Sequence, residues 1–113
     1  MRLKHHRDLT KERWFQFPFF QQILMVANEL NRAANWIKKG DFSEVKLCYE
    51  RAFELLYLTI GTLQGRGKLR EILRFKEMLA LLYSKEKPLL QENSKLEKVL
   101  ILLDRESFLK LNK

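Results

Sequence analysis

The chain contains little cysteine, proline or glycine: one, two and four residues among 113. A single cysteine cannot form an internal disulfide, and no group of Cys and His residues has the spacing of a zinc site. So few glycines and prolines argue against a loop-rich β-sandwich or a collagen-like chain. The longest uncharged stretch, residues 14–28, contains glutamines and a proline. It is shorter than the roughly 20 residues that a membrane-spanning helix needs.

The composition is that of one globular domain. Hydrophobic residues make up 46% of the chain and charged residues 32%, with a net charge of +8. We expect a single helical domain over residues 1–113, in which the polar residues 1–13 form a mobile segment. The basic N-terminus is diluted by Asp8 and Glu12, which argues against a signal peptide. Because a lone thiol suits a reducing compartment, we expect a soluble, cytoplasmic protein without a membrane partner.

The hydrophobic periodicity predicts helices and no strand. Apolar residues recur at spacings of three and four in segments 18–39, 41–61 and 68–84, and a last helix is expected to open near Ser94. We therefore predict an all-α fold, an up-and-down bundle of three to four helices. Residues 18–61 should form an antiparallel helical hairpin within it.

The ends of the expected helices carry capping residues. Gly40 offers the left-handed conformation that ends a helix. Asp41, followed three residues later by Glu44, predicts a capping box at the start of the next helix. Ser94 and Glu97 have the same spacing and predict the start of the last helix.

Residues suited to catalysis are few. His5 and His6 lie in the segment expected to be mobile, where neither is held in a rigid site. Cys48 falls on the apolar stripe of the second helix, which predicts a buried structural thiol. The glycines between residues 61 and 67 fit neither phosphate-loop nor dinucleotide spacing. Neither histidine follows an arginine at the spacing of HEPN-type ribonucleases. We expect no enzymatic activity, no cofactor and no metal ion.

One helix face is basic. Arg66, Arg70 and Arg74 recur every four residues, with Lys68 nearby. Arginines at this spacing can contact successive phosphates of a nucleic acid. The alternative is a solvated face, because glutamates interrupt the basic field and no aromatic residue is expected there to stack on a base.

Five aromatic residues occur within seven positions, and Thr10 is expected to cap a short helical turn that holds the first of them. The cluster either covers the end of the bundle as a lid or forms a surface for a second subunit or another protein. The last helix adds an apolar surface that one subunit cannot fully shelter. We therefore predict a two-fold homodimer through these residues: Trp14, Phe15, Phe17, Phe19, Phe20, Ile101 and Leu102.

Charged residues are expected between the first two long helices. Folding at Gly40 brings Arg32 near Glu50 and Glu29 near Arg51, with Glu54 further along the same seam. Such pairs fix the register of the helices, although an exposed pair contributes only about 0–1 kcal/mol. The functional alternative is a charged pocket for a small ligand or a peptide terminus.

Residues 33–55 contain Gly40, Phe42, Val45, Tyr49 and Ala52 at spacings that resemble the turn and second helix of a tetratricopeptide repeat. No second copy occurs at the period of about 34 residues, and a solenoid needs about three repeats. The resemblance therefore implies a helical hairpin rather than a repeat protein.

A longer pattern covers most of residues 13–74. It consists of Arg13, Trp14, Pro18, Phe19, Gln22, Glu29, Arg32, Ala33, Trp36, Gly40, Glu50, Arg51, Ala52, Glu54, Leu55, Leu56, Leu58, Thr59, Ile60, Arg66, Leu69, Arg70, Glu71 and Arg74. This pattern resembles a group of short, uncharacterised bacterial and archaeal helical proteins. The resemblance implies a fold and no chemistry.

These observations favour a non-enzymatic module that binds another protein or a second copy of itself. The alternative is a basic adaptor that binds RNA or DNA through the arginine face of the third helix.

Overall fold

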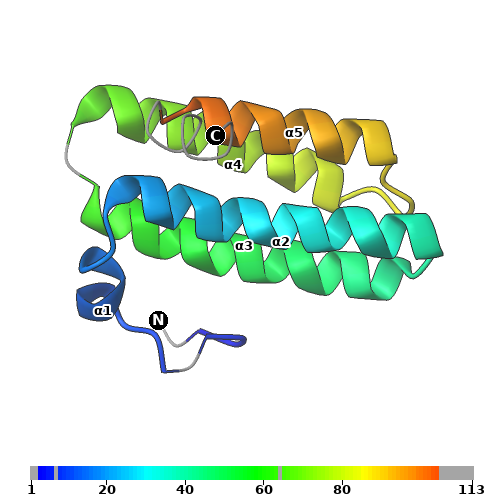
Figure 1. The fold of residues 1–113 in the computed structure, drawn as a ribbon, viewed down its shortest axis with the longest axis horizontal. Coiled ribbons are helices and arrows are strands. Elements are labelled where there is room, and N and C mark those ends of the chain that lie inside the picture. Colours follow the sequence, from blue (N-terminus) through cyan, green and yellow to red (C-terminus); the bar gives the residue numbers. More distant parts are fainter. Residues whose placement is uncertain (1–2, 7, 64, 105–113) are drawn as a thin grey trace.

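The computed structural model describes residues 3–6, 8–63 and 65–104 (Figure 1). This part of the chain contains five helices and no strand, which confirms the predicted all-α class. The helices are α1 (Lys11–Phe15), α2 (Phe19–Lys39), α3 (Phe42–Thr62), α4 (Arg66–Tyr83) and α5 (Leu90–Leu102).

Helices α2 to α5 run alternately up and down and form a four-helix bundle (Figure 1). Helix α2 packs against α3 and α5, and α4 packs against the same two helices. The short α1 lies across one end of the bundle and contacts α3. Each long helix therefore buries one side against two neighbours and leaves its other side exposed.

The turn between α2 and α3 forms where its sequence predicts, but only half of the predicted capping box is present, because the backbone N–H of Asp41 donates to the carbonyl of Trp36 instead of to Glu44. Gly40 has φ 75°, and its N–H donates to the carbonyl of Ile37 at 3.0 Å. The carboxylate of Asp41 accepts a hydrogen bond of 3.3 Å from the backbone N–H of Glu44. A left-handed glycine followed at once by a helix cap folds α3 back along α2.

Helix α5 begins at Leu90, so the expected start at Ser94 is wrong. The backbone N–H of Leu89 donates to the carboxylate of Glu92, and Asn93 lies fully buried in the first turns of the helix. The amide of Asn93 accepts from the Tyr49 hydroxyl at 2.7 Å and donates to the carbonyl of Leu30 at 2.9 Å. Asparagine is a poor helix former, but these tertiary contacts to α3 and α2 outweigh its intrinsic preference.

The described part of the N-terminal region is packed, which differs from the mobile segment expected over residues 1–13. Leu3 is buried, and Thr10 caps α1 by accepting from the backbone N–H of Arg13. Trp14 is fully buried and its indole N–H donates to the hydroxyl of Thr59 at 2.9 Å. Helix α1 therefore attaches the N-terminal residues to α3 through the side chain of Trp14.

Among the residues described, no helix is both long enough and apolar enough to span a membrane.

Candidate functional site

The centre of the seam between α2 and α3 is the buried carboxylate of Glu29. It accepts from Nε of Arg51 at 2.9 Å and from Nη1 of Arg32 at 3.3 Å. Arg51 also reaches the sulfur of Cys48 at 3.4 Å. Burial raises the pKa of the Cys48 thiol, which keeps this buried cysteine neutral. The predicted proximity of Glu29 and Arg51 is present in the structure.

Two other residues of the expected seam have different partners. Arg32 binds Glu29 and does not pair with Glu50, so the expected ion pair between Arg32 and Glu50 is wrong. Glu50 instead contacts Nε2 of His5 at 2.9 Å and accepts from the Tyr83 hydroxyl at 2.9 Å. The reason is that α3 turns this carboxylate away from α2, towards the N-terminal residues and α4.

Glu54 holds the N-terminal segment, defined here as residues 3–6, against α3. Its carboxylate accepts from the backbone N–H groups of Lys4 at 3.1 Å, His5 at 2.8 Å and His6 at 2.9 Å. Nδ1 of His6 lies 3.0 Å from the same carboxylate. Both histidines are therefore fixed in place. The sequence did not predict this, because every residue except proline has a backbone N–H donor and the sequence does not show which of them bind a side chain.

These contacts lower the pKa of both glutamates. For Glu50, the hydrogen bond from His5 is the main cause, and burial acts in the opposite direction. For Glu54, burial acts to raise the pKa, but the hydrogen bonds from His5 and His6 outweigh it and hold the pKa below its ordinary value. Both carboxylates are thus ionised at neutral pH and bind the segment as anions.

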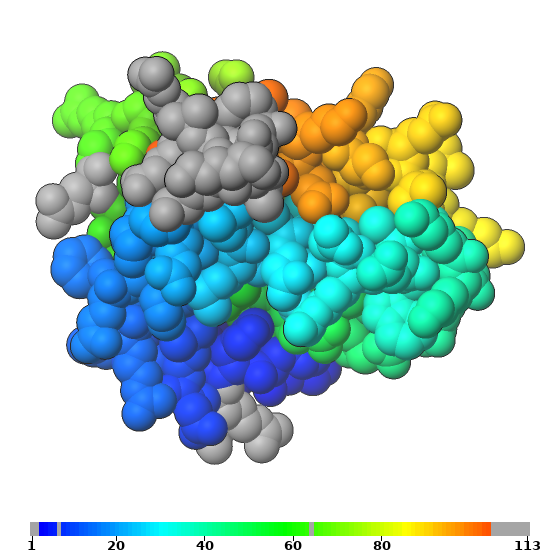
Figure 2. All heavy atoms as spheres, viewed as in Figure 1, coloured from blue at the N-terminus to red at the C-terminus, as the bar shows by residue number. Residues whose placement is uncertain are grey.

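A cleft of about 310 Å³ lies where the N-terminal region, α2 and α3 meet. In Figure 2 the surface is hollowed between the N-terminal residues and α2, with α3 visible in the depth. The cleft brings Glu29, Arg32 and Arg51 of the predicted seam together with His6. Its apolar wall comes from four further side chains, Leu9, Leu24, Met25 and Leu55.

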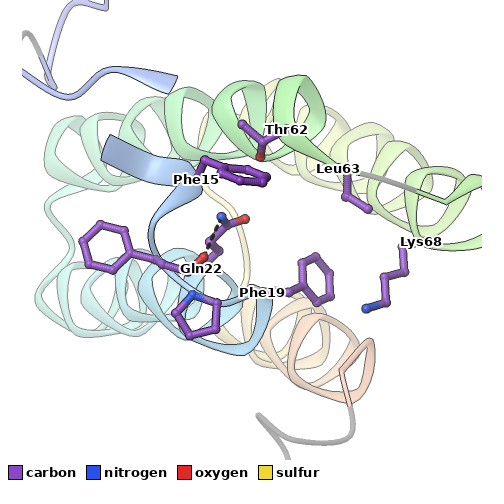
Figure 3. Close-up of a pocket in the computed structure, with 8 residues that line it drawn as sticks. Phe15, Phe19, Gln22, Thr62, Leu63 and Lys68 are labelled. Atoms are coloured by element: carbon purple, nitrogen blue, oxygen red, sulfur yellow. Dashed lines mark hydrogen bonds between the residues drawn. The ribbon is translucent and has the colours of Figure 1, made fainter. Parts of the chain in front are cut away.

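The aromatic cluster is divided between core and surface. Trp14 is buried, so it is not available as the surface contact expected of it. Phe15 is exposed, whereas Phe17, Phe19 and Phe20 are half-buried. Phe15 and Phe19 border a pocket of about 280 Å³ near α4, with Gln22 at its centre (Figure 3). The cluster thus closes one end of the bundle and leaves one phenylalanine in solvent.

The basic face of α4 is a row of three arginines. Arg66, Arg70 and Arg74 are exposed, and no carboxylate pairs with them among the residues that the structure describes. Lys68 lies apart from this row, because its ammonium group sits 4.5 Å from the centre of the Phe19 ring. The three arginines therefore share one face of α4, and Lys68 reaches towards α2; binding of a nucleic acid by these four residues stays a prediction.

A groove with a larger volume than the cleft between α2 and α3 lies between the outer sides of α4 and α5. It has a volume of about 590 Å³, and its apolar surface includes Met78, Leu81 and Val99. Leu81 is 69% exposed, although it is a large aliphatic residue in the last turn of α4. On the same helix as Val99, Leu102 is also exposed, while Ile101 is half-buried against the core. The sequence predicted the apolar surface of the last helix, but it did not predict that Leu81 of α4 adds exposed apolar surface to the same groove.

No three His, Cys, Asp or Glu side chains of the described ranges are grouped in a way that would bind a metal ion. The chain matches no family model, no curated protein and no solved structure.

Proposed function

We propose that this protein is a non-enzymatic helical module that forms a two-fold dimer through the groove between α4 and α5. The observation that carries this proposal is the exposure of apolar side chains on both sides of one groove, with Leu81 on α4 and Val99 on α5. Burying one such side chain contributes about 1.5–3 kcal/mol. Soluble monomers rarely expose large contiguous apolar patches, so such a patch favours an interface.

The polar rim of the groove supports a second copy of the chain as the partner. The rim carries Lys95 and an ion pair between Lys85 and Glu92. A two-fold axis places the same patch on both sides of an interface, so this pair can also form between the two copies, with Lys85 of one copy on Glu92 of the other.

Dimer formation is tested by light scattering across a hundredfold dilution of the full chain. We expect a dimer for the wild type and a monomer for Leu81→Glu, which places a carboxylate in the apolar groove. Leu89→Glu is the matched control, because Leu89 is 61% exposed and does not line the groove. A wild-type monomer at high concentration would refute the proposal. A dimer that survives Leu81→Glu would place the interface elsewhere, for example at Phe15.

A second candidate function is binding of RNA or DNA through Arg66, Arg70 and Arg74. It is favoured by the absence of carboxylate partners for these side chains in the described part of the chain. Residues four apart on a helix are about 6 Å apart along its axis, so the row presents three regularly spaced cations. Guanidinium groups bind phosphates through two parallel hydrogen bonds.

The test is binding of a nonspecific oligonucleotide at several salt concentrations. Replacing Arg66, Arg70 and Arg74 with glutamine should weaken binding and flatten its dependence on salt. A control with the same loss of charge uses three exposed lysines on other faces or helices: Lys38, Lys76 and Lys98. Equal effects of the two triple variants would show that net charge, rather than the arginine row, determines the binding.

A further inference from the structure

The cleft between the N-terminal region, α2 and α3 combines an apolar wall with charged groups at one side. Leu9, Leu24, Met25 and Leu55 supply the wall from three separate elements. Ligand sites are typically apolar clefts in which a few polar groups fix the orientation of the ligand. This cleft has that composition, and its charged groups decide which ligand it fits.

The charged side chains that line the cleft are Glu29, Arg32 and Arg51, which leave one positive charge in excess, while the nearby Glu54 is bound to the N-terminal segment. The buried carboxylate of Glu29 is neutralised by Arg51, whose Nε lies 2.9 Å from Oε2. Arg32 is a second cation on the same carboxylate, held by a single contact of 3.3 Å from Nη1. The Arg32 side chain is 58% exposed, so its remaining N–H groups face solvent at the edge of the cleft.

Asn28 lies one helical turn before Arg32 and also lines the cleft. Residues four apart on a helix are neighbours on the same face, so the amide of Asn28 and the guanidinium of Arg32 can contact one group together. Both supply N–H donors, and the planar guanidinium matches the geometry of a carboxylate. A cation with unused N–H donors beside an apolar wall favours a ligand with an anionic head group and an apolar body.

We propose that this cleft binds a small aliphatic carboxylate, with its head on Arg32 and Asn28 and its chain against Leu24 and Met25. The cleft volume is about 310 Å³. A water-sized group takes about 30 Å³, so the cleft holds roughly ten non-hydrogen atoms. Straight-chain acids with six to eight carbons are of this size. The same chemistry is present at the C-terminus of a peptide that ends in leucine.

The experiment is a titration of the full chain with hexanoate at neutral pH, followed by NMR through the backbone amides. We expect the largest shifts at the residues of α2 and α3 that line the cleft. Affinity should rise by about fourfold for each added methylene until the cleft is full. Arg32→Gln should weaken binding by about tenfold or more, because it removes a hydrogen bond to a charged group.

Arg70→Gln is the matched control, since it removes an exposed arginine from α4, away from the cleft. It should bind hexanoate as the wild type does. Hexylamine and hexanol should bind much more weakly than hexanoate. An acetylated tripeptide that ends in leucine identifies the source of the carboxylate: tighter binding than hexanoate indicates a peptide terminus, and weaker binding indicates a free acid.

Four results would overturn the assignment. These are equal binding of hexanoate and hexylamine, equal affinity of the wild type and Arg32→Gln, shifts confined to residues outside the cleft, and absence of any shift in the wild type. None of these results depends on the oligomeric state, so the cleft and the proposed dimer are tested separately.

Discussion

Replacement of Glu54 with glutamine tests how the N-terminal segment is held. The two carboxylate oxygens bind different donors: Oε2 accepts from the backbone of Lys4 and His5, and Oε1 from the backbone of His5 and His6. Glutamine retains one acceptor oxygen and places an NH₂ group where the other oxygen was. At least one backbone N–H of the segment therefore loses its acceptor, and the remaining bonds lose the help of the negative charge.

The expected loss is about 1.5–3 kcal/mol, the range for hydrogen bonds to a charged group. The loss falls mainly on the local opening of the segment, because Glu54 is partly accessible to water and the core beneath it is unchanged. Amide hydrogen exchange of Lys4, His5 and His6 measures this opening directly. Glu71→Gln is the control, since Glu71 is exposed and has no ion pair among the described residues. Unchanged exchange in Glu54→Gln would refute the role given to this carboxylate.

Three other perturbations have defined outcomes. Folding lowers the pKa values of Glu50 and Glu54. Their contribution to stability is therefore present above about pH 4.5 and is lost as the pH falls through the lower pKa values of the folded state. Urea unfolding at several pH values measures this loss. Tyr49→Phe should cost about 1–3 kcal/mol by leaving the buried amide oxygen of Asn93 without its donor, and adding Asn93→Leu should recover part of that loss in a double-mutant cycle. Gly40→Val should cost about 1–2 kcal/mol in denaturant unfolding, through backbone strain alone, because a Cβ there meets no neighbouring atom.

The sequence predicts the α2–α3 hairpin well because its signals are local. Gly40 and Asp41 fix the end of one helix and the start of the next within two residues, and the hydrophobic periodicity then fixes which sides pack. The proximity of Glu29 and Arg51 follows from the same turn by counting along both helices. These features need no information from elsewhere in the chain.

The start of α5 and the binding of the N-terminal segment depend on distant residues. Asn93 belongs to the helix because Tyr49, 44 positions earlier, donates to its amide oxygen and Leu30, 63 positions earlier, accepts from its NH₂ group. His5 and His6 are held by glutamates that lie between 45 and 49 positions away. Glu50 and Glu54 are four residues apart and share a face of α3, which is the one signal the sequence offers for this contact. Their spacing identifies a pair of acceptors and leaves the donor unknown.

The distribution of charge links the two proposed interactions of α4. Glu29, Glu50 and Glu54 are bound to partners within the chain, whereas the arginines of α4 have no carboxylate partner among the residues that the structure describes. The row that includes Arg74 lies on the same helix as Leu81, seven residues away. In a dimer whose two α4 helices run parallel, the arginine rows of the two copies lie side by side. Like charges at an interface repel, and salt weakens this repulsion over about 10 Å at 0.1 M.

For such a parallel dimer, added salt should affect the two interactions in opposite directions. It strengthens the dimer by screening the repulsion between the two arginine rows, and it weakens nucleic-acid binding, which depends on release of counterions. Light scattering and oligonucleotide binding, measured over the same series of salt concentrations, give the two slopes. In the variant with glutamine at positions 66, 70 and 74 both slopes should approach zero, because one row of charges determines both. A dimer that weakens as salt is added would mean that attraction between charges at the rim, and not burial of Leu81 and Val99, holds the two copies together.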